Sequence, residues 1–427
     1  MITEKKLITN DRLNESYIEA VHSSGLKIYI SEKPEYSSAH AIFGTRYGSI
    51  DTKFRLKGNE NFTDIPEGTA HFLEHKLFES EDGNAFERYA VTGAYANAYT
   101  SFDRTCYLFN CTSRFEENLS ILLDFVRHPY FTAETVEKEQ GIIGQEIRMY
   151  DDEAGWRVFF NLLCAMYSKH PVRIDIAGTT ESIAEITADM LFECHKTFYN
   201  MSNMFICVAG KVNADEVLAQ IDREITENEP REVIRGLHDE PRGINYPRAE
   251  QKLAVAKPLF NLGFKEECKN PEKTLKERIE TAVLLEIIAG KSSALFERLV
   301  NEGLVNDGFG TEYFTGFGYA AEIFDGESSD PEKVAEEIKK EIRRLRENGI
   351  DENDFIGAKN SLYGQMVMQY NVIDNVVSAL VSTAMTGDGM FDEMDVFEKL
   401  TLDDITNCLN RQLLEEHSAL SVIYPAE

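Results

Sequence analysis

Two patterns of apolar residues alternate along this chain. In one, apolar residues are continuous or occupy every second position; in the other, they recur with the period of an α-helix. The first kind predicts strands and the second predicts helices. Strands are expected at residues 26–30, 40–48, 95–111 (a strand pair), 204–209, 253–256 and 259–264. Helices are expected around residues 69–75 and at 114–126, 133–150, from 215 onward, 274–289, 331–347 and 352–369. This order favours an α+β fold in which helices pack on a mostly antiparallel sheet.

The pattern is interrupted once, at residues 229–248. Glu, Pro, Arg and Gly dominate there and no apolar period is visible, which is typical of a linker. A chain of 427 residues is also too long for one small core. We therefore expect an N-terminal domain at 1–228 and a C-terminal domain at 249–427.

The two predicted domains share a weak internal repeat. Residues 131–139 are similar to residues 350–358, and residues 144–150 lie in register with residues 363–369. A duplicated domain explains both the length and the repeat, so we expect two homologous α/β-layered domains. In this register the second copy has Ala358 and Gln365 where the first has Glu139 and Glu146. The second copy also has no segment like His71-Phe-Leu-Glu74-His75 of the first, so the C-terminal domain is predicted to be non-catalytic, with a structural or substrate-enclosing role.

Composition narrows the choice of partners and of compartment. The 74 acidic and 44 basic residues give a net charge of −30, so nucleic acid and anionic membranes should be repelled. A basic substrate would be attracted, although a merely soluble acidic surface explains the charge equally well. Seven scattered Cys without a C-x-x-C spacing indicate reduced thiols. With no signal-like N-terminus and no membrane-length apolar run, we expect a cytoplasmic protein.

The segment His71-Phe-Leu-Glu74-His75 carries the clearest chemical signal. On a helix His71 and His75 are an i, i+4 pair, so both imidazoles can bind one metal ion. Glu74 lies at the edge of that face, within reach of a water at the metal. The order H-x-x-E-H inverts H-E-x-x-H and marks the inverted zincins. The alternative is an amphipathic helix whose histidines only pack. A capping box of Asp64 and Glu67 is expected at its start.

A third protein ligand must come from elsewhere, because catalytic zinc usually has three protein ligands and a water. The predicted helix at 133–150 offers Glu137, Glu139 and Glu146. Glu139 and Glu146 are seven residues apart and share a face, so one could bind metal while the other orients a ligand. Glutamates on a helix are most often solvated surface charges. The spacing alone does not decide whether these residues are such charges or belong to a metal site.

His71-Phe-Leu-Glu74-His75 followed downstream by Glu146 resembles the insulinase (pitrilysin) family of inverted zincins. The similarity is greatest to its processing-peptidase branch and to bacterial members that occur as paired, unequal subunits. The resemblance implies an insulinase-like metallopeptidase fold and one Zn²⁺ per chain, held by His71, His75 and Glu146. It also implies that Glu74 is the general base and that Glu139 is a supporting carboxylate.

Residues 96–107 are similar to the family's edge strand, which holds the substrate backbone. The resemblance implies substrate-binding roles for Asn97 and Ala98. A β-rich strand near a metal can also add a peptide as an extra strand on physical grounds alone. An ordinary sheet strand is the alternative.

The second half departs from the family pattern at an Arg and a Tyr that bind substrate opposite the metal. In the matching stretch, residues 293–306, Val300 stands in place of the Arg and Asn306 stands near the Tyr. Arg298 and Tyr313 are out of register as substitutes. We therefore expect a homologous partner subunit, or a second copy of this chain, to supply the missing pair.

Two classes of function remain open. The first is a zinc endopeptidase that hydrolyses extended peptides or small proteins as the zinc-bearing subunit of a two-subunit processing peptidase. The second is a non-catalytic scaffold or peptide-binding subunit of a family heterodimer, for which zinc would be vestigial.

Overall fold

Two compact units make up the computed structural model, which describes residues 1–81, 83–226, 229–267 and 272–426. Neither unit is continuous in sequence. Unit 1 comprises Met1–Gln145, Asp175–Gly236 and Val367–Phe391, and unit 2 comprises Glu146–Ile174, Leu237–Met366 and Asp392–Glu427. The predicted domains, 1–228 and 249–427, divide the chain into two consecutive homologous halves and are not the same division as these units. The limits of the predicted domains stay a prediction.

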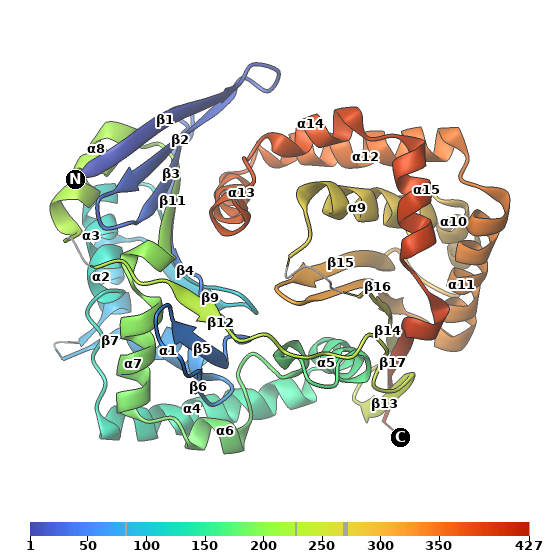
Figure 1. The fold of residues 1–427 in the computed structure, drawn as a ribbon, viewed down its shortest axis with the longest axis horizontal. Coiled ribbons are helices and arrows are strands. Elements are labelled where there is room, and N and C mark those ends of the chain that lie inside the picture. Colours follow the sequence, from blue (N-terminus) through green and yellow to red (C-terminus); the bar gives the residue numbers. More distant parts are fainter. Residues whose placement is uncertain (82, 227–228, 268–271, 427) are drawn as a thin grey trace. The chain divides into compact units, whose positions relative to one another are not determined.

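Unit 1 is built on a seven-stranded sheet within the described residues (Figure 1). Every neighbouring pair is antiparallel except β3 with β11, which is parallel. The helix α1 packs beside β9 and β10, at one end of this sheet. The strand order is β1 (Ile2–Asn10), β2 (Glu15–His22), β3 (Lys27–Glu32), β11 (Met204–Gly210), β4 (Ala39–Thr45), β10 (Thr105–Cys111) and β9 (Tyr95–Thr100).

Unit 2 repeats the last five positions of that sheet. Its order is β13 (Arg248–Leu253), β17 (Ser418–Pro425), β14 (Leu259–Lys265), β16 (Tyr319–Glu327) and β15 (Gly310–Gly316). The pair β13–β17 is parallel and the other pairs are antiparallel, which matches β3-β11-β4-β10-β9 strand for strand. The predicted α+β class, with two layered and mostly antiparallel domains, is confirmed.

The helices follow the apolar periods of the sequence closely. In the first half they are α1 (Thr69–Leu77), α2 (Ala85–Thr92), α3 (Phe115–Phe125), α4 (Ala133–Asp152), α5 (Ala154–Met166), α6 (Thr180–Ala184), α7 (Ala188–Phe198) and α8 (Ala214–Glu224). In the second they are α9 (Leu275–Ala289), α10 (Ala294–Asn301), α11 (Pro331–Asn348), α12 (Glu352–Gln369), α13 (Ile373–Thr386), α14 (Asp392–Lys399) and α15 (Leu402–Arg411). The division between the units falls inside both α4 and α12.

Each unit contains one helix from the other half of the chain. The helix α13 belongs to unit 1 and packs on β3, β4 and β11, where fully buried Val377 and Leu380 join Phe205 and Cys207 in one core. The helix α5 belongs to unit 2 and packs on β13, β14 and β17. Apolar surface on both sides of these contacts leaves water, so each sheet is stabilised by a sequence-distant helix.

The variant Leu380→Ala is expected to destabilise unit 1 by about 2–5 kcal/mol, the usual cost of emptying a buried leucine site. The exposed residue Asn375 lies on the same helix, so Asn375→Ala should change stability by less than about 0.5 kcal/mol. Urea unfolding followed by circular dichroism measures both. Equal midpoints for the two variants would mean that α13 contributes little to unit 1.

Two local predictions are wrong, and the segment predicted as a linker holds a strand that was not expected. The expected capping box is absent from the start of α1, because Gly68 is its N-cap and Asp64 instead pairs in β6 (Thr63–Asp64) with β5 (Lys53–Leu56). The strand expected at 253–256 lies at Arg248–Leu253. The predicted linker contains a short strand, β12 (Val233–Arg235), which pairs with β5.

The cysteines that the structure describes are all free and mostly buried, as expected of reduced thiols, and Cys268 lies outside the described residues. Two short strands, β7 (Glu79–Ser80) and β8 (Gly83–Asn84), form a hairpin before α2. Among the helices of the described ranges, none combines the length and the apolarity that crossing a bilayer requires.

Candidate metal centre

The helix α1 presents both histidines of the H-x-x-E-H segment on one face. It begins after Gly68, whose φ of 85° is favoured only by glycine. A Cβ at this position would also lie 2.4 Å from the carbonyl oxygen of Ala177, so the backbone passes too close for a side chain. The imidazole rings of His71 and His75 follow within the next two turns, with centroids 4.5 Å apart.

Glu146 of α4 joins the two histidines. One ligand atom from each of His71, His75 and Glu146 lies within 4.8 Å of the others. Zinc binds nitrogen and carboxylate oxygen at about 2.0–2.2 Å, so ligand atoms this close to one another are compatible with one common ion. Two imidazoles and one carboxylate are also a donor set found in catalytic zinc sites. The chemistry and spacing of these residues therefore fit zinc, and their role as ligands stays a prediction.

Glu139 lies one layer behind the histidines. It is buried on α4, and its Oε1 is 3.0 Å from Nδ1 of His75. A carboxylate at Nδ1 fixes the orientation of an imidazole and leaves Nε2 to bind a metal. The contact is the one expected of a supporting carboxylate, which agrees with the role that the family resemblance implies for Glu139.

The protonation state of His71 favours metal binding. Burial, and then the neighbouring His75, lower the pKa of His71 to about 3. The imidazole is therefore neutral at neutral pH, and a neutral imidazole has the lone pair that a metal requires.

Glu74 points toward β9, where it meets a residue to which the sequence assigned no role. The hydroxyl of Thr100 donates a hydrogen bond of 2.6 Å to Oε2 of Glu74. This contact fixes the rotation of the carboxylate next to the two histidines. Thr100 lies within the segment that resembles the family edge strand, but its contact with Glu74 depends on how α1 packs on β9.

Asn97 and Ala98 lie on β9, which is the last strand in the order of the unit 1 sheet. The backbone N–H of Ala98 donates to Oδ1 of Asn97 at 2.9 Å, and Nδ2 of Asn97 donates to the hydroxyl of Tyr95 at 3.2 Å. The side chain of Asn97 thus accepts from the N–H of Ala98, a donor at the sheet edge to which an added strand would otherwise bind. The substrate-binding role of both residues stays a prediction.

In unit 2, other residues stand at the positions expected to carry Arg and Tyr, and the nearby Arg298 and Tyr313 have structural contacts or places of their own. Val300 lies on α10, and Asn306 lies in the turn before β15, where its Nδ2 donates to Oε2 of Glu327 at 3.0 Å. Nε of Arg298 is 3.3 Å from Oε2 of Glu337 on α11, so this guanidinium is engaged in an ion pair. Tyr313 is part of β15.

Two family models match the chain. One is described as insulinase (peptidase family M16) and matches residues 59–180, the range that contains His71, His75 and Glu146. The other is described as the peptidase M16 inactive domain and matches residues 185–362. The predicted resemblance to the insulinase family is confirmed, and the inactive-domain match agrees with the loss of the motif in the second half.

Relatives with zinc protease and processing peptidase names are similar to this chain. The uncharacterized zinc protease YmfH of Bacillus subtilis (strain 168) is 38% identical over 98% of this chain and 99% of its own. A probable mitochondrial-processing peptidase subunit beta of Schizosaccharomyces pombe is 29% identical over 52% of this chain and 47% of its own. The crystal structure of an M16-like peptidase from Alicyclobacillus acidocaldarius has a TM-score of 0.91 and 33% identity, covering 99% of this chain and 98% of that one.

Proposed function

Because this chain belongs to the insulinase family, peptidase family M16, we propose that it is a zinc-dependent endopeptidase that hydrolyses extended peptides. One observation carries the proposal: the ligand atoms of His71, His75 and Glu146 lie within 4.8 Å of one another, and Glu74 is on the same helix as the histidines. Zinc held by these residues would polarise the scissile carbonyl and acidify water, as it does in other zinc hydrolases.

Glu74 is the proposed general base. The hydroxyl of Thr100 holds this carboxylate in place through Oε2, and the carboxylate would take a proton from the water that attacks the carbonyl carbon. The C–N bond then breaks, and Glu74 would return that proton to the leaving amine. Glu139 would act through His75, by keeping the imidazole in the orientation and tautomer that bind metal.

The strand β9 would hold the substrate by adding it to the edge of the unit 1 sheet. Main-chain hydrogen bonds would give such a peptide its affinity, with little dependence on side chains. A substrate carbonyl oxygen would replace Oδ1 of Asn97 as the acceptor for the N–H of Ala98. The exchange keeps the number of hydrogen bonds constant, so adding the strand leaves no donor unpaired.

A homologous partner subunit is proposed to complete the site. Val300 and Asn306 stand where an Arg and a Tyr are expected, so these two positions lack the groups that would bind the substrate opposite the metal. Similarity to a processing peptidase subunit beta supports a paired assembly. The same two positions favour the second candidate, a non-catalytic subunit, because an enzyme that lacks these groups would be slow by itself.

Peptide hydrolysis by the zinc-loaded chain, alone and mixed with a second family member from the same source, tests these proposals. We expect little turnover of an unstructured fluorogenic peptide by the chain alone and at least about 100-fold more in the mixture, since positioning and charge-stabilising groups contribute factors of this size. Full activity of the isolated chain would rule out the partner requirement. No turnover in either sample, with zinc bound, would favour the non-catalytic subunit.

A further inference from the structure

The segment that connects the two halves of the chain is tied to unit 1 by an arginine. The strand β12 pairs with β5 and ends at Arg235. The next residue, Gly236, is the last of this part of unit 1 before the chain passes into unit 2. The side chain of Arg235 is only 19% exposed. Arginine is mostly exposed unless it is paired, so a guanidinium this far from water needs specific partners.

The guanidinium of Arg235 bridges two loops of unit 1. Its Nε is 2.6 Å from Oδ1 of Asp51 and its Nη2 is 3.3 Å from Oδ2, so the ion pair is forked. Nη2 also donates to the carbonyl oxygens of Arg46 at 3.2 Å and Asp103 at 3.3 Å. Arg46 and Asp51 lie in the loop after β4, and Asp103 lies in the turn between β9 and β10. A planar fork of donors can serve these acceptors together, as a lysine ammonium could not.

The carboxylate that pairs with this guanidinium is buried and holds its own loop. Asp51 is 2% exposed, and its Oδ2 accepts the N–H of Gly48 at 2.8 Å. Burial raises the pKa of Asp51 and the neighbouring Arg235 opposes this shift, so the charge of Asp51 depends on the guanidinium. Arg235 therefore fixes the loop after β4 as well as the turn.

The loop after β4 contacts the β9–β10 turn through its backbone. The N–H of Ser49 donates to the carbonyl oxygen of Ser101 at 3.0 Å. The N–H of Ile50 donates to the carbonyl oxygen of Phe102, also at 3.0 Å. The two segments approach so closely that a Cβ at Gly48 would lie 2.4 Å from the carbonyl oxygen of Phe102. The turn is thus held from two sides, by backbone donors of the loop and by the guanidinium.

Thr100, whose hydroxyl contacts Glu74, immediately precedes this turn. It is the last residue of β9, and it pairs with Thr105 across the hairpin. The turn is closed by the N–H of Ser101, which donates to the carbonyl oxygen of Arg104 at 2.8 Å. A shift of the turn would therefore move the hydroxyl of Thr100, which donates to Oε2 of Glu74 at 2.6 Å. The contacts of the guanidinium lead, through one turn, to the proposed general base.

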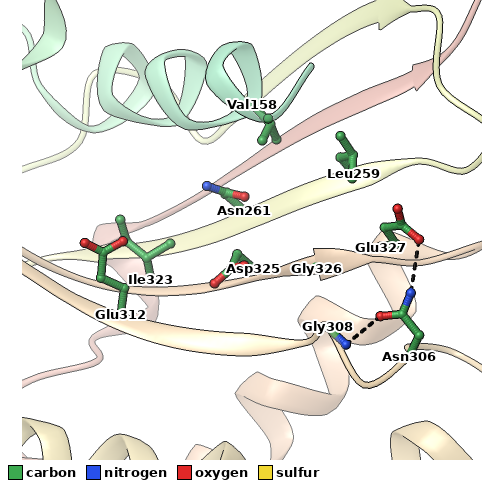
Figure 2. Close-up of a pocket in the computed structure, with 11 residues that line it drawn as sticks. Val158, Leu259, Asn261, Asn306, Gly308, Glu312, Ile323, Asp325, Gly326 and Glu327 are labelled. Carbon is green, nitrogen blue, oxygen red and sulfur yellow. Dashed lines mark hydrogen bonds between the residues drawn. The ribbon is translucent and has the colours of Figure 1, made fainter. Parts of the chain in front are cut away.

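The corresponding hairpin of unit 2, β15 with β16, is built differently. Two residues separate Gly316 from Tyr319, the last pair of its ladder, whereas four separate the last pair of β9 and β10. Figure 2 shows part of its strands, on the floor of a pocket of about 440 Å³. This turn is contacted by His170, whose Nε2 is 3.0 Å from the carbonyl oxygen of Phe317. The longer turn and its arginine therefore belong to the half that carries the metal motif, and the hairpin itself does not require them.

We propose that Arg235 is a positioning residue, which holds the β9–β10 turn so that the hydroxyl of Thr100 stays on the carboxylate of Glu74. The inference rests on the proposed peptidase function, in which Glu74 is the general base. Arg235 would act through the turn and not on the reacting atoms. The connection between the halves would thus contribute to the chemistry of the half that carries the metal motif.

Amide hydrogen exchange of the zinc-loaded full-length chain tests this brace without turnover. Arg235→Lys keeps the positive charge but cannot reach the carboxylate and both carbonyl oxygens at once. We expect the amides of residues 99–105 to exchange about ten-fold faster in this variant, because the turn opens locally, while those of α1 stay unchanged. Arg231→Lys is the matched control, since it makes the same change on the same segment, where the guanidinium donates to the carbonyl oxygen of Lys196. Equal exchange of the turn in both variants would overturn the proposal.

A cycle of single and double variants in the assembled enzyme tests whether the brace acts through Thr100. Thr100→Val removes the hydroxyl that contacts Glu74. We expect it and Arg235→Lys each to lower kcat about ten-fold, because small misplacements of a catalytic group are costly. KM should stay within about two-fold, because the contacts of the substrate are unchanged. The double variant should be no slower than Thr100→Val alone, since residues that act along one path are not additive. A merely structural role of Arg235 would give the product of the two effects, which would overturn the proposal.

A second variant displaces the same turn without removing the guanidinium. The Cβ of Gly48→Ala would push on the carbonyl oxygen of Phe102, so kcat should fall and should again be non-additive with Thr100→Val. Melting curves show whether each variant is folded. Faster exchange of the turn with unchanged kcat would refute the role of Arg235 in the reaction. Absence of cleavage by every sample, the unchanged chain included, would refute the proposed activity, and exchange would still decide whether Arg235 holds the turn.

Discussion

Glu74→Gln is expected to lower kcat for peptide hydrolysis by about 10²–10⁴-fold, the contribution usual for a general acid–base group. Gln keeps the size of the side chain and can still accept the hydroxyl of Thr100, but it cannot take a proton from water. The carboxamide should therefore leave the fold and the zinc content as they are. Turnover of a fluorogenic peptide by the assembled enzyme gives kcat, and elemental analysis gives zinc per chain.

The matched control for this variant is Glu137→Gln. Glu137 is exposed on α4, so the substitution makes the same change of charge near the site without touching α1. It should leave kcat within about two-fold, as surface changes usually do. Undiminished hydrolysis by Glu74→Gln would remove Glu74 from the mechanism, and loss of zinc from this variant would show that it acts on metal binding.

The second large effect concerns the two carboxylates of α4, which should differ in their influence on zinc affinity. Glu139→Gln is expected to weaken zinc binding by about 10–100-fold, because Glu139 contacts His75 and would act through it. Glu146→Gln should weaken binding more, by over about 100-fold, because it replaces a charged ligand by a neutral amide. Competition with a chromophoric chelator measures both affinities in the full chain.

The order of these two affinities assigns the roles. Glu137→Gln should bind zinc as the unchanged chain does, because its side chain is exposed on the same helix. A weaker affinity in Glu139→Gln than in Glu146→Gln would exchange the roles of ligand and supporting carboxylate. Equal and normal affinities in all three variants would mean that the metal is held by other residues.

Elements with a strong apolar period could be predicted from sequence, because burial sets that period locally. The helix expected at 274–289 is α9, Leu275–Ala289, with Thr274 as its N-cap. The start of α1 could not be predicted in this way, since Gly68 is required by the backbone of Ala177, more than 100 positions away in sequence. The strand β12 within the predicted linker depends equally on its distant partner β5.

The candidate metal centre shows the same limit. The spacing of His71, Glu74 and His75 is local, so the sequence predicts a shared helix face. Choosing Glu146 as the third ligand required the family resemblance, because spacing alone left several carboxylates on α4.

The helices α5 and α13, each of which packs on a sheet from the other half of the chain, suggest how this chain evolved. The helix α5 follows α4, and α13 follows α12, and α4 and α12 contain the similar segments of the internal repeat. The two traded helices are therefore equivalent, and the chain has the architecture of a domain-swapped dimer whose copies have been joined end to end.

Such a joined dimer cannot be divided into its halves by cutting one loop. The chain passes between the units after residues 145, 174, 236, 366 and 391. A cleavage at residues 237–247 would leave α5 in one fragment without the unit 2 sheet on which it packs. The other fragment would contain α13 without the unit 1 sheet. Each half needs the other to bury its own apolar surface, so mutation of the duplicated, motif-less half remains constrained by the stability of the half that carries the metal ligands.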